Sequence, residues 1–239
     1  DGSLASPRAF PTLAGVSDIA VADWDGDGKP EVFLLSTEER QIGVARLDDG
    51  ERLPFPTLIP FDGRPLVMAV GSLQPNAKPV LAVIVDQDGR RSLVIRTADG
   101  ATRTQKLSEN FKSNPTALAI HDVNQDGWPD LLALIPYEKV KVLLQSSARD
   151  FDELEVAPPG GADIAQPWFS TADVDGDRKP ELLLAQRNFV RAVVLSPEPG
   201  RQSAPVTNWV FQVKDQINGA TGNSRIIGAA AVKQGDRKS

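Results

Sequence analysis

Residues 23–31 read Asp23-Trp24-Asp25-Gly26-Asp27-Gly28-Lys29-Pro30-Glu31, with acidic side chains at positions 1, 3, 5 and 9 of the nine. The pattern returns at residues 122–130, DVNQDGWPD, and at residues 173–181, DVDGDRKPE. A short apolar run follows each copy at once, as in Val32-Phe33-Leu34-Leu35. Three copies in the same context indicate a repeated unit in which an acidic loop leads into a β-strand.

The proline at position 8 of each copy gives the length of the repeat. Pro30, Pro79, Pro129 and Pro180 are 49, 50 and 51 residues apart. Pro79 belongs to a fourth stretch, residues 72–80, whose flanks match but whose acids are absent. Residues 23–31, 72–80, 122–130 and 173–181 are called the first, second, third and fourth loops from here on. The sequence pattern of a fifth copy begins within residues 224–239.

Each unit is predicted to contain four short strands, because runs of apolar and β-branched residues alternate with Gly, Pro, Asn and Asp. The expected strands are 15–22, 31–36, 41–47 and 53–59; 66–70 and 80–85; 116–120, 131–135, 140–144 and 154–156; and 164–170, 182–185, 189–195 and 209–213. The first two strands of each unit read almost continuously apolar, which predicts burial on both faces. A sustained helical period is absent, so long helices are not expected.

Four short strands repeated every fifty residues predict an all-β fold, a β-propeller of four-stranded blades. We expect residues 1–239 to form a single propeller domain with blades at about 15–62, 66–107, 115–158 and 164–217, and the start of a fifth at 224–239. A ring that stops within a blade leaves an open sheet edge. The chain is therefore expected to be part of a larger ring, or to lack its last strands.

Composition narrows the classes of function. The chain has no cysteine, which excludes disulfides and thiolate metal sites. Its single histidine excludes zinc sites built from several His or Cys ligands. The three acidic loops carry 11 of the 32 acidic residues, and the net charge is -6. With no basic patch interleaved with aromatics, nucleic acid is not an expected partner, and no apolar run has the roughly 18 residues of a membrane span.

The acidic loops predict up to three sites for a hard divalent cation. Calcium takes six to eight oxygen ligands at roughly 2.3–2.6 Å, whereas magnesium keeps more water, so calcium is the preferred ion. Positions 1, 3, 5 and 9 would offer side chains, and position 7 its backbone carbonyl. The EF-hand is excluded, because position 12 is Leu34, Ala133 or Leu184 and strands rather than helices flank the loops.

The loops and their spacing resemble the FG-GAP/VCBS repeats of integrin-α-like β-propellers, in which a calcium loop joins the first two strands of a blade. The resemblance implies these ligands: Asp23, Asp25, Asp27, Lys29 carbonyl and Glu31; Asp122, Asn124, Asp126, Trp128 carbonyl and Asp130; Asp173, Asp175, Asp177, Lys179 carbonyl and Glu181. The Phe-Gly and Gly-Ala-Pro signatures are absent, so integrin-like ligand recognition is not inferred. The second loop offers Ser72, Gln74, Asn76 and Val80 and is expected to be metal-free.

Position 6 of the fourth loop departs from the pattern, because Arg178 replaces the glycine. A left-handed turn there would cost a non-glycine residue about 1 kcal/mol, which predicts a weaker site. His121 is interpreted as a structural or solvated residue rather than a catalytic one. The four tryptophans could form a sugar-binding platform, but their unrelated positions favour packing or simple surface roles. They are Trp24, Trp128, Trp168 and Trp209.

Two functions remain open at this stage. The favoured hypothesis is a non-enzymatic calcium-binding module, extracellular or periplasmic, for recognition of a protein or carbohydrate, for adhesion, or for assembly. The alternative is a carbohydrate-active enzyme of polysaccharide lyase type, or a subunit of a larger exported enzyme complex. No catalytic residue is predicted, and the oligomeric state stays open, because a fold does not by itself determine function.

Overall fold

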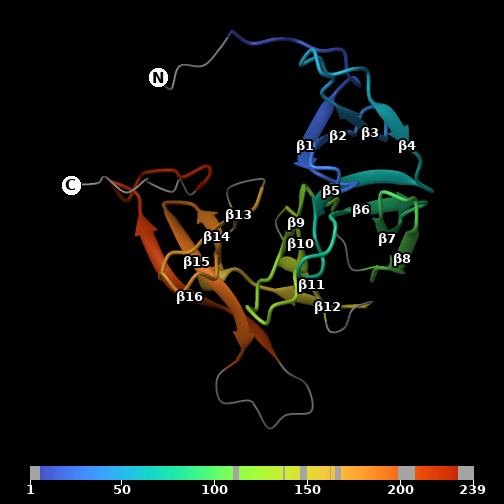
Figure 1. Ribbon diagram of the computed structural model, residues 1–239. Helices are drawn as coiled ribbons and strands as arrows, with labels where there is room; N and C mark the ends of the chain where they lie inside the picture. The colour runs from blue at the N-terminus through green and yellow to red at the C-terminus, as the bar shows by residue number, and fades with distance from the viewer. Residues whose placement is uncertain are drawn as a thin grey trace. The chain divides into compact units, whose positions relative to one another are not determined.

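The computed structural model describes residues 6–109, 113–136, 138–145, 150–161, 163–164, 168–198 and 208–230. They form four antiparallel sheets of four strands each, and in every sheet each strand pairs with the next one along the chain (Figure 1). The one helical element in the described part of the chain is a short 3-10 turn, η1, at Pro159–Gly161. The all-β prediction is confirmed.

The strand bounds follow the predicted repeat closely. The first sheet contains β1 (Val16–Ala22), β2 (Glu31–Ser36), β3 (Gln41–Arg46) and β4 (Thr57–Ile59). The second contains β5 (Arg64–Gly71), β6 (Val80–Gln87), β7 (Arg90–Arg96) and β8 (Thr102–Lys106). The third contains β9 (Ala117–His121), β10 (Asp130–Leu134), β11 (Val140–Gln145) and β12 (Phe151–Val156). The fourth contains β13 (Ser170–Ala172), β14 (Glu181–Gln186), β15 (Phe189–Pro197) and β16 (Trp209–Asn218).

The chain divides into two compact units, and each has its own core. One holds Asp1–Gly71 and Lys78–Leu107, the other Ser72–Ala77 and Ser108–Ser239. The core of the first unit consists of Phe33, Leu35, Ile42, Ile59, Met68, Leu81, Val83, Val85 and Val94. The core of the second consists of Val123, Leu132, Val140, Val142, Leu144, Val156, Leu182, Leu184, Val193, Leu195 and Phe211. Within each unit, apolar side chains from two successive sheets therefore share one interior.

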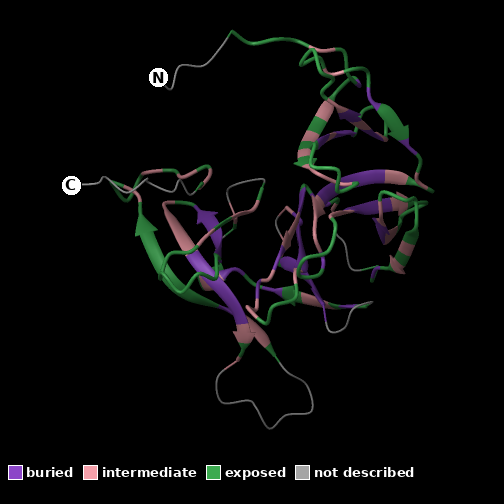
Figure 2. Cartoon of the chain, in the orientation of Figure 1, coloured by how far each residue is buried: buried purple, intermediate pink, exposed green. Residues whose placement is uncertain are grey.

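Burial confirms the expected double-sided packing for most of the inner strands. All five residues of β10 and all six of β14 are buried, and β2 and β6 are nearly so (Figure 2). For β1 the prediction was wrong, because Ile19 and Val21 are 60% and 59% exposed. Only alternate residues of β1 face the rest of its unit, where Ala20 packs against the core. A continuous apolar run thus did not guarantee a second packing partner.

Two predicted strands were wrong in position or length. The strand expected at 164–170 is β13, Ser170–Ala172; Ile164 contributes one isolated bridge to Gln186, and residues 165–167 lie outside the described residues. The proline-rich strand expected at 53–59 is reduced to β4, because a proline cannot donate to a sheet. Of the expected fifth unit, residues 224–230 form no strand and residues 231–239 lie outside the described residues.

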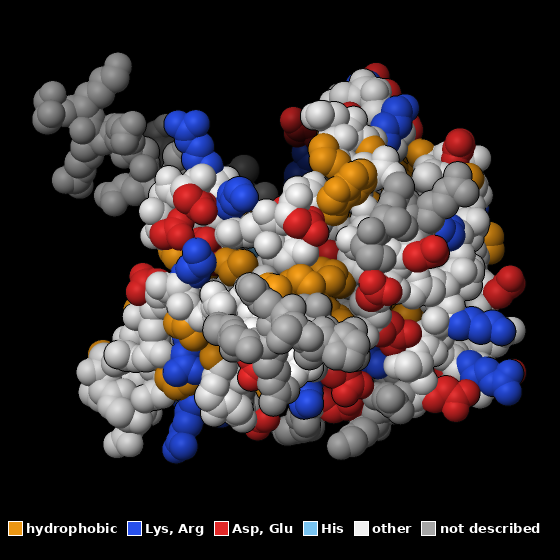
Figure 3. All heavy atoms as spheres, turned by 90° about the horizontal axis from the view of Figure 1, so that it is seen from below, with side chains coloured by type: hydrophobic (Ala, Val, Ile, Leu, Met, Phe, Trp, Pro, Cys, Tyr) orange, Lys and Arg blue, Asp and Glu red, His pale blue; other side chains and the backbone are white. Residues whose placement is uncertain are grey.

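The surface mixes charges of both signs. On the face drawn in Figure 3, Lys and Arg side chains are interspersed with Asp and Glu side chains. The described part of the chain contains no helix with the length and apolarity that crossing a bilayer requires.

Candidate metal centre

Each acidic loop connects the first two strands of its sheet and is folded by its own side chains. In the first loop, Asp23 accepts hydrogen bonds from the backbone N–H groups of Gly26 and Gly28, both at 2.9 Å. The carboxylates at positions 3 and 5 each accept a hydrogen bond from the backbone N–H two residues later. Asp25 accepts the N–H of Asp27, and Asp27 accepts the N–H of Lys29. These are the Asx turns that short acidic side chains favour. The sequence of the loop is therefore sufficient to wind it.

The third and fourth loops repeat this pattern of bonds. Asp122 and Asp173 at position 1 each accept two backbone N–H groups, over distances of 2.7–3.1 Å. The residues at positions 3 and 5 again accept the N–H two residues ahead. Positions 4 and 6 have positive φ in all three loops: Gly26 and Gly28, Gln125 and Gly127, Gly176 and Arg178. The φ of Arg178 is 71°, which confirms the left-handed turn predicted at position 6.

The carboxylate at position 9 closes each loop onto its second residue. Glu31 accepts the N–H of Trp24 at 2.7 Å, Asp130 that of Val123 at 3.0 Å, and Glu181 that of Val174 at 2.9 Å. One oxygen of each position-9 carboxylate is thus committed to the loop backbone. The other oxygen has a different partner in each loop, and that partner distinguishes the three candidate sites.

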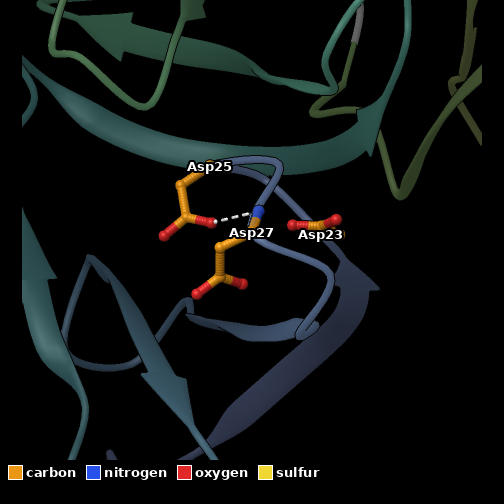
Figure 4. Close-up of side chains that lie close together, drawn as sticks. All are labelled: Asp23, Asp25 and Asp27. Atoms are coloured by element: carbon orange, nitrogen blue, oxygen red, sulfur yellow. Dashed lines mark hydrogen bonds between the residues drawn. The ribbon is translucent and has the colours of Figure 1, made fainter.

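In the first loop the three aspartates converge, and an arginine joins them. One oxygen each of Asp23, Asp25 and Asp27 lies within 4.8 Å of the others, and Figure 4 shows Asp25 and Asp27 side by side. The guanidinium of Arg46, from the end of β3, donates to Asp27 Oδ2 at 2.6 Å and to Asp25 Oδ2 at 2.8 Å. It also contacts Glu31 Oε1, from Nε at 2.7 Å and from Nη2. The bonds to Glu31, Asp27 and Asp25 raise the pKa of Arg46. The hydrogen bond from Lys29 N–H and, as a smaller cause, the hydrogen bond from Arg46 lower the pKa of Asp27.

The third loop is the most buried and carries the fewest available carboxylate oxygens. Asp130 is fully buried, accepts N–H bonds from Val123 and Gln145, and has its pKa raised by burial to about 7. Burial also raises the pKa of Asp122. The amide Nδ2 of Asn124 donates to Asp126 Oδ2 at 2.8 Å, so one oxygen of Asp126 is already engaged within the loop, and position 3 adds no carboxylate. Among the described residues, the three acids of this loop do not form a cluster like those of the other two.

The fourth loop fits a hard cation best. Oxygens of Asp173, Asp175 and Glu181 lie within 4.8 Å of one another, and Glu181 is fully buried. The remaining oxygen of Glu181 accepts a neutral donor, Nε2 of Gln125, at 3.1 Å. The cation nearest to this cluster in the described structure is Lys214, whose Nζ lies 3.6 Å from Asp175 Oδ2. Carboxylate oxygens are the kind of ligand that calcium takes.

The remaining predicted ligands are the backbone carbonyls at position 7. The N–H groups of Lys29, Trp128 and Lys179 each bond the position-5 carboxylate of their own loop. The carbonyl of Lys179 accepts Nε2 of Gln125 at 3.5 Å. That these three carbonyls bind metal stays a prediction.

Sequence reasoning missed the basic and amide side chains that reach the acidic loops from elsewhere. Arg46 was detectable in principle, because a four-residue turn after β2 sets Ser36 opposite Gln41 and therefore Glu31 opposite Arg46. Lys78, whose Nζ donates to the carbonyl of Asp25 at 2.5 Å, comes from the second loop. Gln125, which contacts Glu181, comes from the third loop. No local signal announces contacts across more than 50 residues.

His121 and the tryptophans take the places expected of packed or surface residues. His121 is 9% exposed, pairs with Asp130 across β9 and β10, and has its pKa lowered by burial to about 4. Trp24 packs edge-on against Phe33 with ring centroids 5.2 Å apart, whereas Trp128 and Trp168 are 41% and 49% exposed. Among the described residues, no two of the four tryptophans form an aromatic pair with each other.

Comparison with known proteins identifies the repeat. Residues 122–184, which run from the third loop into β14, match the family model of the FG-GAP-like repeat. No curated protein sequence matches the chain significantly.

Solved structures resemble the chain in fold. The structure of BBS1N in complex with ARL6DN matches with a TM-score of 0.52 at 12% identity, covering 94% of this chain and 60% of that one. A ctPRC2 complex matches with a TM-score of 0.54 at 13% identity, covering 92% of this chain and 45% of that one. The biofilm matrix protein Bap1 of V. cholerae has a TM-score of 0.43 at 16% identity, with 84% and 28% covered. The chain thus spans less than two thirds of the length of each.

Proposed function

The chain carries an FG-GAP-like repeat at residues 122–184, and we propose that it is a non-enzymatic, calcium-stabilised β-propeller module that recognises a protein or carbohydrate partner outside the cytoplasm. The observation that carries this proposal is the cluster of Asp173, Asp175 and Glu181 oxygens, all within 4.8 Å, inside the matched segment. FG-GAP repeats are typical of extracellular proteins, which supports an extracellular or periplasmic location.

The propeller arrangement rests on the sheets themselves. Each of the four is a four-stranded antiparallel sheet whose strands follow in chain order, which is the construction of a propeller blade. In both compact units two successive sheets share an apolar core, as neighbouring blades do. We assign the blades to residues 15–62, 66–107, 115–158 and 164–217, with 224–239 beginning the next.

Calcium would act here as a brace rather than as a catalyst. In the fourth loop Asp173, Asp175, Asp177 and Glu181 would hold it, and the ion would supply strong attraction for oxygens contributed after β13 ends and at the first residue of β14. The loops already wind through their own Asx turns. The second loop has no carboxylates, yet β5 and β6 on either side of it are paired over seven residue pairs. A sheet of this type therefore forms without an ion, and calcium adds stability by mass action.

The calcium concentration outside the cytoplasm suits a stabilising site of this kind. Calcium sites in extracellular modules typically have dissociation constants of about 0.1–1 mM, which cytosolic calcium would not fill. At 2 mM calcium a site of this affinity stabilises the folded chain by about 0.6–1.8 kcal/mol. We expect the melting temperature to rise by about 1–7 °C for a chain of this size.

Thermal unfolding of the whole chain in EDTA and in 2 mM CaCl₂ tests the calcium claim. The rise in melting temperature is expected to shrink in Asp175→Asn, which removes a carboxylate from the fourth loop. Gln74→Ala, the matched change at position 3 of the second loop, is expected to leave the rise intact. Equal melting temperatures in EDTA and calcium for the parent chain would refute calcium stabilisation.

The recognition role needs a separate experiment. We expect saturable binding to one member of a panel of acidic and neutral polysaccharides and extracellular proteins in 2 mM CaCl₂, without turnover. Release of shortened polysaccharide products would instead assign the chain to carbohydrate-active enzymes.

A further inference from the structure

The first loop shows the strongest three-aspartate motif in the sequence, but the structure fills it with an internal cation. Arg46 reaches three carboxylates with four hydrogen bonds: two to Glu31, one to Asp25 and one to Asp27. The Glu31 side chain is only 9% exposed, so this part of the network is shielded from water. Arginine suits the place because its planar fork of N–H groups can serve several carboxylate oxygens at once.

The oxygens that Arg46 takes are those that the loop leaves free. Asp25 and Asp27 use Oδ1 for the backbone and give Oδ2 to Arg46. Glu31 divides its oxygens in the same way, with Oε2 on Trp24 N–H and Oε1 on Arg46. Both oxygens of Asp23 already accept backbone N–H groups. The guanidinium therefore engages the three carboxylate oxygens that accept no backbone N–H group.

A second positive charge stands beside the same loop. Nζ of Lys78 donates to the carbonyl oxygen of Asp25 at 2.5 Å, and its stem lies against Gly26. Four carboxylates at the first loop thus face two fixed cations from within the same compact unit. A divalent ion entering this cluster would meet repulsion from both.

The third and fourth loops lack an arginine opposite position 9. Arg46 is directly opposite Glu31 in the β2–β3 pairing. In the fourth sheet Leu182 pairs with Val193, so the residue that follows opposite Glu181 is Val194, which is uncharged. In the third sheet Leu131 pairs with Leu143, and Leu144 follows. Lys214 approaches only Asp175, at 3.6 Å, so the fourth loop retains a carboxylate cluster without an arginine fork.

We propose that Arg46 is the resident cation of the first loop, which makes this loop structurally complete without metal and leaves divalent ions to the fourth. The inference rests on the proposed calcium function for the comparison between loops, but its geometry does not depend on that function. It reverses the sequence-based ranking, in which Arg178 marked the fourth loop as the weaker site. Calcium can enter the first loop only by displacing Arg46.

The test isolates the first loop within the chain of residues 1–239. Asp126→Asn combined with Asp175→Asn removes a carboxylate from the third and fourth loops, and CaCl₂ is then titrated by calorimetry with and without Arg46→Gln. Arg46→Gln removes the charge-assisted bonds that calcium would otherwise have to displace. It should therefore tighten calcium binding by about tenfold or more. Arg46→Lys, which retains the charge without the fork, should give a smaller gain. Arg46→Gln in the otherwise unchanged chain should also lower the melting temperature in EDTA.

The outcomes separate this inference from the proposed function. If Arg46→Gln gains no calcium affinity in the double variant, Arg46 does not hold the place of a metal and the inference is wrong. It is equally wrong if the double variant with Arg46 intact binds calcium as tightly as the unchanged chain, a measurement that requires no change at Arg46. Absence of calcium binding by the unchanged chain would refute the proposed calcium function instead, while a gain in Arg46→Gln would still support the inference.

Discussion

Nζ of Lys179 lies 3.1 Å from the carbonyl oxygen of Gln125, although 54 residues separate the two in sequence. The side-chain amide of Gln125 in turn donates a hydrogen bond to the carboxylate of Glu181. The first unit shows the same device, because Lys78 bonds the carbonyl of Asp25 across 53 residues. Both lysines stand at position 7 of their loops. Within each unit, a lysine therefore bonds a backbone carbonyl in the acidic loop of the preceding repeat.

Replacing Lys179 by methionine should destabilise the chain by about 0.5–1.5 kcal/mol, because one hydrogen bond of a charged donor is lost while the apolar stem is retained. Urea unfolding in EDTA measures the change without a contribution from calcium. Lys29→Met is the matched control at position 7 of the first loop. Lys29 makes only a 3.7 Å ion pair with Asp49, which is fully exposed, so its replacement should have little effect. Equal losses in the two variants would contradict the role of the tie between loops.

Arg178→Gly should stabilise the chain by about 1 kcal/mol, because a non-glycine residue at a φ of 71° carries a left-handed penalty that glycine does not. Chemical denaturation of the two proteins in EDTA gives the difference. The reciprocal change, Gly28→Ala at position 6 of the first loop, should cost a similar amount, because Gly28 has a φ of 89° with no neighbouring atom to clash. A loss of stability in Arg178→Gly would show that the arginine side chain contributes more than its backbone costs.

Acid should destabilise the chain in part through His121. Its folded-state pKa of about 4 lies below the ordinary 6.5, so the unfolded chain binds a proton that the folded chain refuses as the pH falls from about 6.5 to 4. The stability contributed by neutral His121 is present above pH 6.5 and is lost below it, by about 2–3 kcal/mol at pH 4.5.

His121→Gln removes this titration, and its unfolding free energy should therefore decrease less between pH 7 and 4.5 than that of the unchanged chain. Urea unfolding at a series of pH values in EDTA measures the difference. Asp130 has a raised pKa and an opposite effect, since its protonation favours the folded state as the pH falls below 7, but this effect is common to both proteins. Parallel pH profiles would contradict the assignment to His121.

Two variants of Lys141 should separate the stability contributed by its buried aliphatic stem from the stability contributed by its paired charge. Its side chain is 2% exposed, and Nζ bonds Ser108 Oγ at 2.9 Å and lies 3.5 Å from Glu153. Lys141→Ala should cost about 2–4 kcal/mol, because it removes a buried stem and leaves the carboxylates without their cation. Lys141→Met fills the same space and should cost less than half as much. Differential scanning calorimetry of both variants in EDTA tests this, and equal losses would show that the charge rather than the stem matters.

The sequence by itself determined the local structure of this protein. The loop geometry depends on contacts within nine residues: Asp23 to Gly28 N–H and Glu31 to Trp24 N–H are both encoded by spacing, and so is the left-handed φ of Arg178. The four-stranded sheets were predicted from the same kind of local pattern, in which apolar runs alternate with turn residues. Where burial depended on a neighbouring sheet, as for Ile19 on β1, the same pattern gave the wrong answer.

Only the tertiary structure decided which side chains from outside each acidic loop lie against its carboxylates. The first and fourth loops are nearly alike in sequence, and they differ in what the rest of the fold places against them. The β2–β3 register brings Arg46 to Glu31, whereas packing within the second unit brings the neutral amide of Gln125 to Glu181. Electrostatic interactions depend on distance in space rather than in sequence. A motif of nine residues therefore specifies the oxygens, and the surrounding sheets specify whether a protein cation has already taken them.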